Sequence, residues 1–216
     1  FCLMPNHVHF LIKEIRERVV DFIKKQAGEK PVVIGLSGGI DSAVAAYLAV
    51  EALGKNRVYG LIMPSKTNSK DDSRLAKEVV KALDIRCWIL DIDKLENSFK
   101  KTADFFVNIK SLGNLKARLR MCLLYGKANE IDGLVLGTGN KSELMTGYFT
   151  KYGDGGVDIL PIGDLYKTQV RELAKYLNVS REIIHRPPTA GLWEGQTDEG
   201  ELGNTYNNLD KILLAI

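Results

Sequence analysis

A short glycine-containing turn in the first quarter of the chain carries the residue types that bind phosphate groups. The sequence "SGGIDS" (37–42) follows the apolar run "VVIGL" (32–36) and leads into an alanine-rich segment with helical spacing (41–53). A helix that starts directly after a strand leaves its first amide groups unpaired at its positive end. Gly38 and Gly39 allow the backbone to turn tightly and to approach a ligand closely. The segment therefore predicts an anion-binding loop at the carboxyl end of a strand.

A simpler explanation of the same residues is a connecting turn in which Ser37 or Asp41 caps the helix. Capping accounts for one polar residue and one glycine, but not for the six residues together. The segment also lacks the spacing of the two common phosphate loops, G-x-x-x-x-G-K-[ST] and G-x-G-x-x-G. We therefore favour a phosphate-binding function over a connecting turn.

The rest of the chain alternates between short apolar runs and segments with helical spacing. We expect strands at 32–36, 58–63, 87–92 and 133–138. We expect helices at 14–27, 41–53, 71–83, 94–107, 114–130 and 166–177. Strands that alternate with helices predict an α/β fold, a doubly wound parallel sheet with helices on both faces. The polar, glycine-rich segment 138–165 is predicted to be a functional loop.

The length and composition are typical of a single domain with one hydrophobic core. Of its 216 residues 45% are hydrophobic, and 30 basic against 27 acidic side chains give a net charge of +3. Because the charges form no basic block, they predict neither nucleic acid nor membrane as a partner. No apolar run reaches the roughly 18 residues of a membrane span, and the first residues lack signal-peptide order. We therefore expect a cytoplasmic protein.

The three cysteines, Cys2, Cys87 and Cys122, are odd in number and share no C-x-x-C spacing. Such cysteines are typical of reduced thiols in a cytosolic protein rather than of a disulfide framework. Their apolar neighbours predict that Cys87 and Cys122 are buried.

Several motifs together resemble one known enzyme family. "SGGIDS" resembles the pyrophosphate loop of N-type ATP pyrophosphatases, which cleave ATP between the α and β phosphates and transfer AMP to an oxygen of the substrate. Three further segments resemble ammonia-dependent NAD synthetases: "ARLRM" (117–121), "VLGTGNKSELMTGYFTKYGDGGVDILPIGDLYKTQV" (135–170) and "PPTAGLWEGQTDEGELG" (187–203). The resemblance covers residues 14–216 and implies an adenine nucleotide alpha hydrolase-like, Rossmann-like fold. Another pyrophosphatase-loop ligase, of the GMP synthetase or tRNA-thiolation type, is the alternative within this class.

The resemblance implies that the nicotinate carboxylate of deamido-NAD attacks the α phosphorus of ATP, after which ammonia displaces AMP. Asp41 and Glu143 would serve catalysis as ligands of Mg²⁺, a hard cation that prefers oxygen ligands. Arg118, Lys151 and Asp158 would hold deamido-NAD. The residues that would line ATP are Gly35, Leu36, Ser37, Gly38, Gly39, Ile40, Asp41, Ser42, Thr138, Lys167 and Thr189. The family also implies a homodimer and ammonia, rather than glutamine, as the direct nitrogen donor.

Each of these residues has a simpler interpretation when it is taken alone. Glu143 is compatible with a solvated acid at a helix start, and Lys167 with a surface lysine. Arg118 could lie on a solvated helix face with its basic neighbours Lys116 and Arg120. The spacing across the second quoted segment matches the family pattern without insertion, which favours the functional interpretation.

Both ends of the chain depart from the family pattern. The segment "FCLMPNHVHFLI" (1–12) resembles a fragment of an IS200-like transposase, in which His7 and His9 on one face of a strand would share a metal ion. We expect residues 1–13 to be a fusion or assembly scar, with a nucleic-acid-binding remnant as the alternative of a different class. The synthetase domain (14–216) is expected to be truncated at its carboxyl end, where the family carries a His-Lys pair that contacts deamido-NAD.

Overall fold

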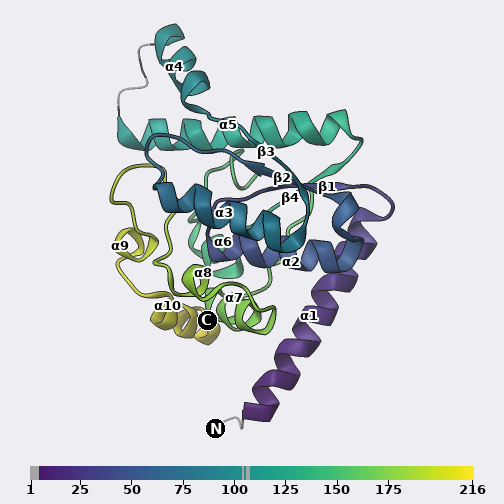
Figure 1. Ribbon diagram of the computed structural model, residues 1–216. Coiled ribbons are helices and arrows are strands. Elements are labelled where there is room, and N and C mark those ends of the chain that lie inside the picture. The colour runs from purple at the N-terminus through teal and green to yellow at the C-terminus, as the bar shows by residue number, and fades with distance from the viewer. Residues whose placement is uncertain (1–4, 104, 106–107) are drawn as a thin grey trace.

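The computed structural model describes residues 5–103, 105 and 108–216, with side chains from residue 9 onward. In this part of the chain the strands are β1 (Val32–Gly35), β2 (Val58–Ile62), β3 (Arg86–Ile89) and β4 (Leu134–Leu136). The helices, labelled in Figure 1, are α1 (Pro5–Ala27), α2 (Ile40–Leu53), the 3₁₀ helix η1 (Lys55–Arg57), α3 (Lys70–Leu83), α4 (Asp93–Thr102), α5 (Ile109–Glu130), α6 (Lys141–Thr146), α7 (Lys167–Tyr176), α8 (Arg181–His185), α9 (Asp198–Leu202) and α10 (Tyr206–Ala215).

The four strands form one parallel sheet in the order β3-β2-β1-β4. Val33 in β1 lies opposite Tyr59 in β2 and Val135 in β4. The chain therefore moves outward from β1 through β2 to β3 and then returns to the other side of β1. That reversal defines a doubly wound sheet, as predicted, and it opens a crevice at the carboxyl ends of β1 and β4.

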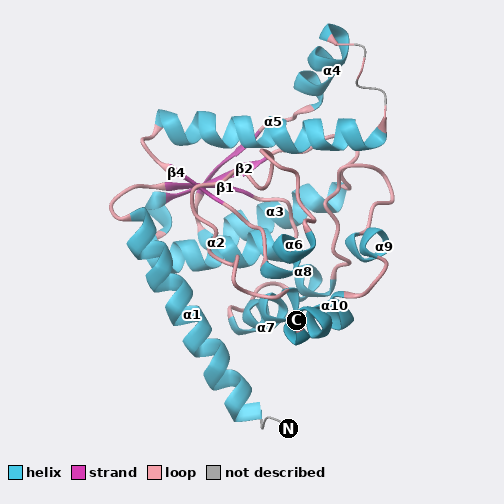
Figure 2. Ribbon diagram, turned by 180° about the vertical axis from the view of Figure 1, so that it is seen from behind, coloured by secondary structure: helices cyan, strands magenta, loops and turns pink. Residues whose placement is uncertain are grey.

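Helices cover both faces of the sheet (Figure 2). Val32 and Ile34 pack into one core cluster with residues of α1, α2, α3 and α7. Val33 packs on the opposite face, where Ala128 and Leu124 of α5 cover it. Successive side chains of a strand point to opposite faces, so an unbroken apolar strand needs cover on both sides.

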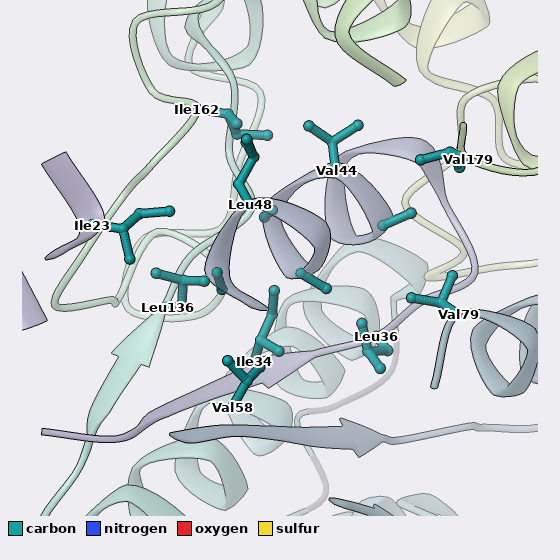
Figure 3. Packing of buried hydrophobic residues seen from close by; sticks show 14 of the residues in the cluster. Ile23, Ile34, Leu36, Val44, Leu48, Val58, Val79, Leu136, Ile162 and Val179 are labelled. Atoms are coloured by element: carbon teal, nitrogen blue, oxygen red, sulfur yellow. The ribbon is translucent and has the colours of Figure 1, made fainter. Parts of the chain in front are cut away.

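The larger core is centred on α2, directly behind the glycine-containing turn (Figure 3). Val44 and Leu48 are fully buried there, between Ile34 of the sheet and the helices on the outer side. The alanines of α2 are buried as well and leave little volume between the helix and the sheet. The anion-binding end of α2 is therefore held by packing along its whole length.

The predicted strands and helices are all present, with ends that differ by a few residues except in α1, α4 and α5. The helix expected at 94–107 ends at Thr102, and residues 104 and 106–107 lie outside the described part. The loop expected at 138–165 contains the short helix α6, and α8, α9 and α10 were not predicted. These helices have five to ten residues, too short for a clear helical period.

The strand on which the shared histidine face depends is not present at residues 5–12, because α1 begins at Pro5 and continues without a break to Ala27. Positions 7 and 9, two residues apart on a helix, point in directions about 200° apart and do not share a face. The His7 side chain lies outside the described residues, whereas the His9 ring lies 5.0 Å from that of Tyr176. The helical backbone therefore does not place positions 7 and 9 on one face, as a metal site shared by His7 and His9 would need.

The burial of the cysteines differs from the prediction. Cys87 is half-buried and Cys122 is exposed, so the expectation of a buried thiol is wrong for Cys122. Cys122 lies on the outer side of α5, and its apolar neighbours in sequence face the sheet.

Within the part of the chain that the structure describes, no helix is both long and apolar enough to cross a membrane.

We predict that Leu48→Ala lowers the free energy of unfolding by about 2–5 kcal/mol, because the side chain is fully buried and would leave a cavity. Leu214→Ala is the control, since that leucine is 68% exposed and its loss is expected to change stability by less than about 0.5 kcal/mol. Urea denaturation of both variants measures the difference. Equal losses would contradict the packing described for α2.

Candidate active site

The carboxyl ends of β1, β2 and β4 open into a cavity of about 580 Å³. Its walls include residues that follow each of these strands, the inner side of α5, and the segment 187–193 near the carboxyl end. A crevice in this position is where doubly wound sheets bind ligands. The cavity is lined by every residue of the predicted "SGGIDS" loop except Gly38. It is also lined by Thr138, Glu143, Lys167 and Thr189.

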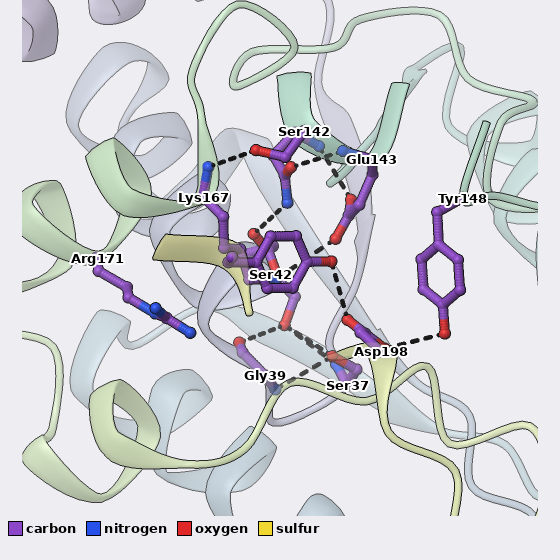
Figure 4. Close-up of polar contacts among 12 residues, drawn as sticks. Ser37, Gly39, Ser42, Ser142, Glu143, Tyr148, Lys167, Arg171 and Asp198 are labelled. Carbon is purple, nitrogen blue, oxygen red and sulfur yellow. Dashed lines mark hydrogen bonds and ion pairs between the residues drawn. The ribbon is translucent and has the colours of Figure 1, made fainter. Parts of the chain in front are cut away.

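The loop is held in shape by its own two serines (Figure 4). The Ser42 hydroxyl donates to the Gly39 carbonyl at 3.0 Å and accepts from the Ser37 amide at 3.3 Å. The Gly39 amide in turn donates to the Ser37 hydroxyl at 3.1 Å. The serines at both ends of "SGGIDS" therefore fix the turn from which α2 starts, with Asp41 in its first turn.

Two features of the structure require glycine at position 38. Its φ is +82°, a conformation that side chains other than glycine rarely adopt. A Cβ atom at this position would overlap the backbone carbonyl of Asp72 in α3. Asp72 is itself fixed, because it forms a capping box with Ser69 and an ion pair with Arg186. The turn is thus pressed against the start of α3.

A lysine lies between two carboxylates at the floor of the cavity. Lys167 Nζ donates to Asp41 Oδ2 at 2.5 Å and to Glu143 Oε1 at 3.4 Å, and only 2% of the lysine is exposed. The other Asp41 oxygen accepts from Asn140 Nδ2 at 3.0 Å. Asn140 also forms a capping box with Glu143, which fixes the start of α6. Asp41, which is more than a hundred positions from the other two residues in sequence, therefore meets Glu143 and Lys167 at one ammonium group.

The net charge of this group depends on the protonation of Glu143. Burial alone would lower the pKa of Lys167, but Asp41 and Glu143 outweigh it and raise the pKa, so the ammonium is maintained. Burial raises the pKa of Glu143 to about 8 despite the opposing charge of Lys167. A carboxyl group with this pKa is largely protonated at neutral pH, so Asp41 balances the ammonium, and a bound cation would favour the ionised form of Glu143.

The two carboxyl groups suit a divalent cation. Asp41 and Glu143 offer hard oxygen ligands, and Mg²⁺ is commonly bound by one or two carboxylates together with substrate phosphates and water. In the described part of the chain no group of three or more acidic, histidine or cysteine side chains forms a complete metal site. The donor set is therefore suited to a cation that arrives with a phosphate ligand, not to a permanently caged metal.

Asp198 and two tyrosines form a second polar group beside Lys167 and were not predicted as site residues. Asp198 is buried and accepts from Tyr206 at 3.2 Å and from Tyr148 at 3.3 Å. Burial raises its pKa, although Lys167 opposes the shift. The segment "QTDEGELG" carries Asp198 within a quoted motif, but nothing in its spacing identified a partner for the carboxylate.

The segment that contains Thr189 covers part of the cavity. The Thr189 hydroxyl donates to the Gln196 carbonyl at 2.7 Å and is thus turned into its own segment. The Leu192 carbonyl accepts from Lys116 Nζ at 3.1 Å, and the Lys116 ammonium also pairs with Glu96 of α4 at 3.7 Å. Lys116 is therefore a buried anchor of the cover rather than part of a solvated face.

The three residues predicted for deamido-NAD lie outside the residues that line the cavity. Arg118 is exposed and donates from Nε to the backbone carbonyl of Lys151 at 3.3 Å, so these two lie side by side. Asp158 accepts from the Tyr125 hydroxyl at 3.0 Å and from the Val135 amide at 2.8 Å. Their assigned role stays a prediction for the surface outside the cavity.

Arg120, which the sequence placed beside Arg118 on a possible solvated face, points the other way and lines the cavity. It donates to the Met63 carbonyl at 3.1 Å and to Asn68 Oδ1 at 3.0 Å, and it forms no ion pair within the described residues. Burial lowers its pKa to about 10. Side chains two positions apart on a helix point in directions about 200° apart, so a helical wheel of α5 could have separated Arg118 from Arg120.

Comparisons with known proteins agree with this geometry. A model of the NAD synthase family matches residues 11–216. The chain belongs to the NAD synthase family. The NH(3)-dependent NAD(+) synthetase of Archaeoglobus fulgidus is 51% identical over 208 residues, which are 94% of this chain and 84% of that protein.

Solved structures of similar synthetases share the fold. The NMN synthetase from Francisella tularensis has a TM-score of 0.90 and 42% identity, covering 94% of this chain and 86% of that chain. The NH3-dependent NAD synthetase from Campylobacter jejuni has a TM-score of 0.77 and 38% identity, covering 95% and 87%. Membership of the NAD synthase family confirms the resemblance of the quoted motifs and decides against a GMP synthetase or tRNA-thiolating enzyme.

We predict that Gly38→Ala distorts the "SGGIDS" loop of this NAD synthase family member. Left-handed backbone in a non-glycine residue costs about 1–3 kcal/mol, and the added methyl group would also displace the Asp72 carbonyl. The affinity for Mg-ATP, measured by calorimetry, is expected to fall at least tenfold.

Gly54→Ala is the matched control for this prediction. Gly54 has a φ of +80°, but an added Cβ there meets nothing within 4 Å. It should lose stability in urea denaturation and keep its affinity for Mg-ATP. An equal loss of ATP binding in both variants would mean that backbone strain, and not contact with α3, determines the shape of the loop.

Proposed function

We propose that this chain forms the amide of NAD from deamido-NAD, ATP and ammonia, with the cavity at the ends of β1 and β4 as its active site. The observation that carries the proposal is the buried Lys167 ammonium held between Asp41 and Glu143 in front of the "SGGIDS" loop. The reacting carboxylate and the phosphates are all anionic, so catalysis depends on positioning and on charge neutralisation.

The loop and α2 would hold the phosphates that leave as pyrophosphate. Helix α2 is long enough to present a strong positive end, and Ser37, Gly39 and Ser42 shape the turn in front of it. Lys167 would neutralise charge on the phosphates, because its pKa is raised and its ammonium persists in the buried site. Thr138 and Thr189, which both line the cavity, complete the proposed ATP pocket.

Asp41 and Glu143 would hold Mg²⁺ together with oxygen atoms of ATP. When bound, the cation supplies positive charge to the phosphate oxygens. The carboxylates themselves set the distance between the loop and α6, since Asp41 contacts Asn140 and Glu143 caps the same helix start. In the reaction a nicotinate oxygen bonds to the α phosphorus as pyrophosphate leaves, and ammonia then bonds to the carboxyl carbon as AMP leaves.

Deamido-NAD would extend from the cavity onto the surface that carries Arg118, Lys151 and Asp158. Large apolar side chains are exposed on β3, α4 and the start of α5: Trp88, Ile89, Leu95 and Ile109. Helix α4 projects past α5 from the body of the molecule (Figure 1). Exposed apolar surface of this kind supports a homodimer, in which the partner would cover these side chains and complete the dinucleotide site.

One observation supports nicotinate mononucleotide as a second acceptor substrate. The residues predicted to hold the dinucleotide lie outside the cavity, and the similar structure from Francisella tularensis is an NMN synthetase. Nicotinate mononucleotide would need only the cavity itself. Ratios of kcat/KM for deamido-NAD and nicotinate mononucleotide distinguish the two functions, and we expect the dinucleotide to be preferred. We place the reaction in the cytoplasm, where ATP is available, and assign it to residues 14–216.

We predict that Asp41→Asn lowers kcat for NAD formation by 10²–10³-fold, since it removes a charge that holds the ammonium and the metal. The exposed Asp21→Asn in α1 is the control and should retain normal turnover. Release of pyrophosphate with Mg-ATP and deamido-NAD measures both variants. Normal turnover of Asp41→Asn would reject the metal assignment.

We further predict that Arg120→Gln and Arg118→Gln differ in the substrate that they affect. Arg120 lies in the cavity without an ion pair, and a charged hydrogen bond to a substrate anion is worth about 1.5–3 kcal/mol, or tenfold and more in kcat/KM. Its loss should weaken turnover with both acceptors. Loss of Arg118 should raise KM for deamido-NAD and leave nicotinate mononucleotide unaffected. The opposite pattern would mean that Arg118 turns into the cavity when substrate binds.

A further inference from the structure

Helix α10 presents two buried polar residues to the active site from the far end of the chain. Tyr206 and Asp210 are four positions apart and thus lie on one face of the helix. Both are almost completely buried. This face packs against α6, which carries Glu143, and against α7, which begins with Lys167. The position of α10 beside these helices is visible in Figure 1.

The Asp210 carboxylate joins the starts of α6 and α7. Its Oδ1 accepts from the Ser142 hydroxyl at 2.5 Å, and its Oδ2 accepts from the Thr168 amide at 2.8 Å. The Ser142 hydroxyl also accepts from the Lys167 amide at 2.9 Å. Asp210 therefore binds Thr168, the residue after the lysine, and Ser142, the residue before Glu143, and through Ser142 it reaches the Lys167 amide.

A carboxylate at this place has a clear electrostatic role. The first amide groups of α7 are unpaired within the helix and carry partial positive charge, and Asp210 satisfies one of them. Only 2% of Asp210 is exposed, and it forms no ion pair within the described residues. Burying an unpaired carboxylate is costly unless hydrogen bonds compensate it, so its interactions with α6 and α7 are what keep it there.

Tyr206 contacts the other end of the same lysine. Lys167 Nζ lies 4.9 Å from the centre of the Tyr206 ring, a distance at which the ring face attracts a cation. The Tyr206 hydroxyl donates to Asp198 Oδ2 at 3.2 Å. The ring thus limits the movement of the ammonium, while Asp210 fixes the backbone from which the lysine side chain extends.

We propose that Asp210 and Tyr206 are positioning residues that set Lys167 between Asp41 and Glu143. Neither residue lines the cavity, so both act through the lysine. The inference rests on the proposed role of Lys167 in catalysis. It assigns to α10 a part in the reaction that the quoted motifs, which end at residue 203, do not include.

A double-mutant cycle tests the inference with Asp210→Asn, Lys167→Met and the double variant. Asp210→Asn is expected to lower kcat and the affinity for Mg-ATP at least tenfold in the otherwise unchanged protein. In the Lys167→Met background the same change should alter both quantities less than twofold, because residues that act as a unit are not additive. Lys211→Ala, exposed on the same helix, is the control and should leave both unchanged.

The outcomes separate the inference from the proposed function. Equal effects of Asp210→Asn in both backgrounds, or normal kcat and ATP affinity in a folded Asp210→Asn, would overturn the role of Asp210. Full activity of Lys167→Met would reject the proposed role of the lysine, and the inference would fall with it. Urea denaturation of each variant shows whether it is folded under assay conditions.

Two milder variants keep the inference falsifiable if Asp210→Asn does not fold. Ser142→Ala retains the contact of Asp210 with Thr168 but removes the link to the Lys167 amide, and it should lower kcat several-fold. Tyr206→Phe keeps the ring over the ammonium and should retain more activity than Tyr206→Leu, which removes it. Normal kcat in Ser142→Ala, or equal activity of the two Tyr206 variants, would contradict the positioning role.

Discussion

One buried ammonium group determines how the rest of the site is arranged. Lys167 lies between Asp41 and Glu143, and each of the three comes from the first turn of a different helix. Their charges are favourable only while all three stay together, because any one of them left alone in the interior would be costly. The ends of α2, α6 and α7 are therefore tied to one point, and the cavity forms around it.

The surrounding structure serves to hold these three helix starts. Helix α2 is fixed by its packing in the core, α6 by the capping box of Asn140, and α7 by the hydrogen bond to Asp210. The sheet supplies the common frame, since its reversal between β1 and β4 places the "SGGIDS" loop beside the segment that follows β4. Phosphate binding and metal binding then use groups that are already positioned.

The sequence predicted the parts of this arrangement that have a local signal. Unbroken apolar runs gave the strands, and the spacing of the quoted motifs identified Asp41, Glu143 and Lys167, which the structure brings together. The role of Asp210 depends on contacts between distant segments, which no local pattern encodes, whereas the inward direction of Arg120 follows from the helical period of α5. The short helices after residue 177 were missed for a related reason, since packing rather than periodicity stabilises them.

The distances along the chain between the site residues have a consequence for biosynthesis. Asp41 and Lys167 are 126 positions apart, and Ser142 and Asp210 are 68 apart. During translation β1, α2 and β2 can pack soon after they emerge, whereas the lysine and then α10 appear much later. A nascent chain thus carries Asp41 beside an unfinished crevice until Lys167 and α10 have emerged. The three helix starts are tied together only after α10 has docked on α6 and α7.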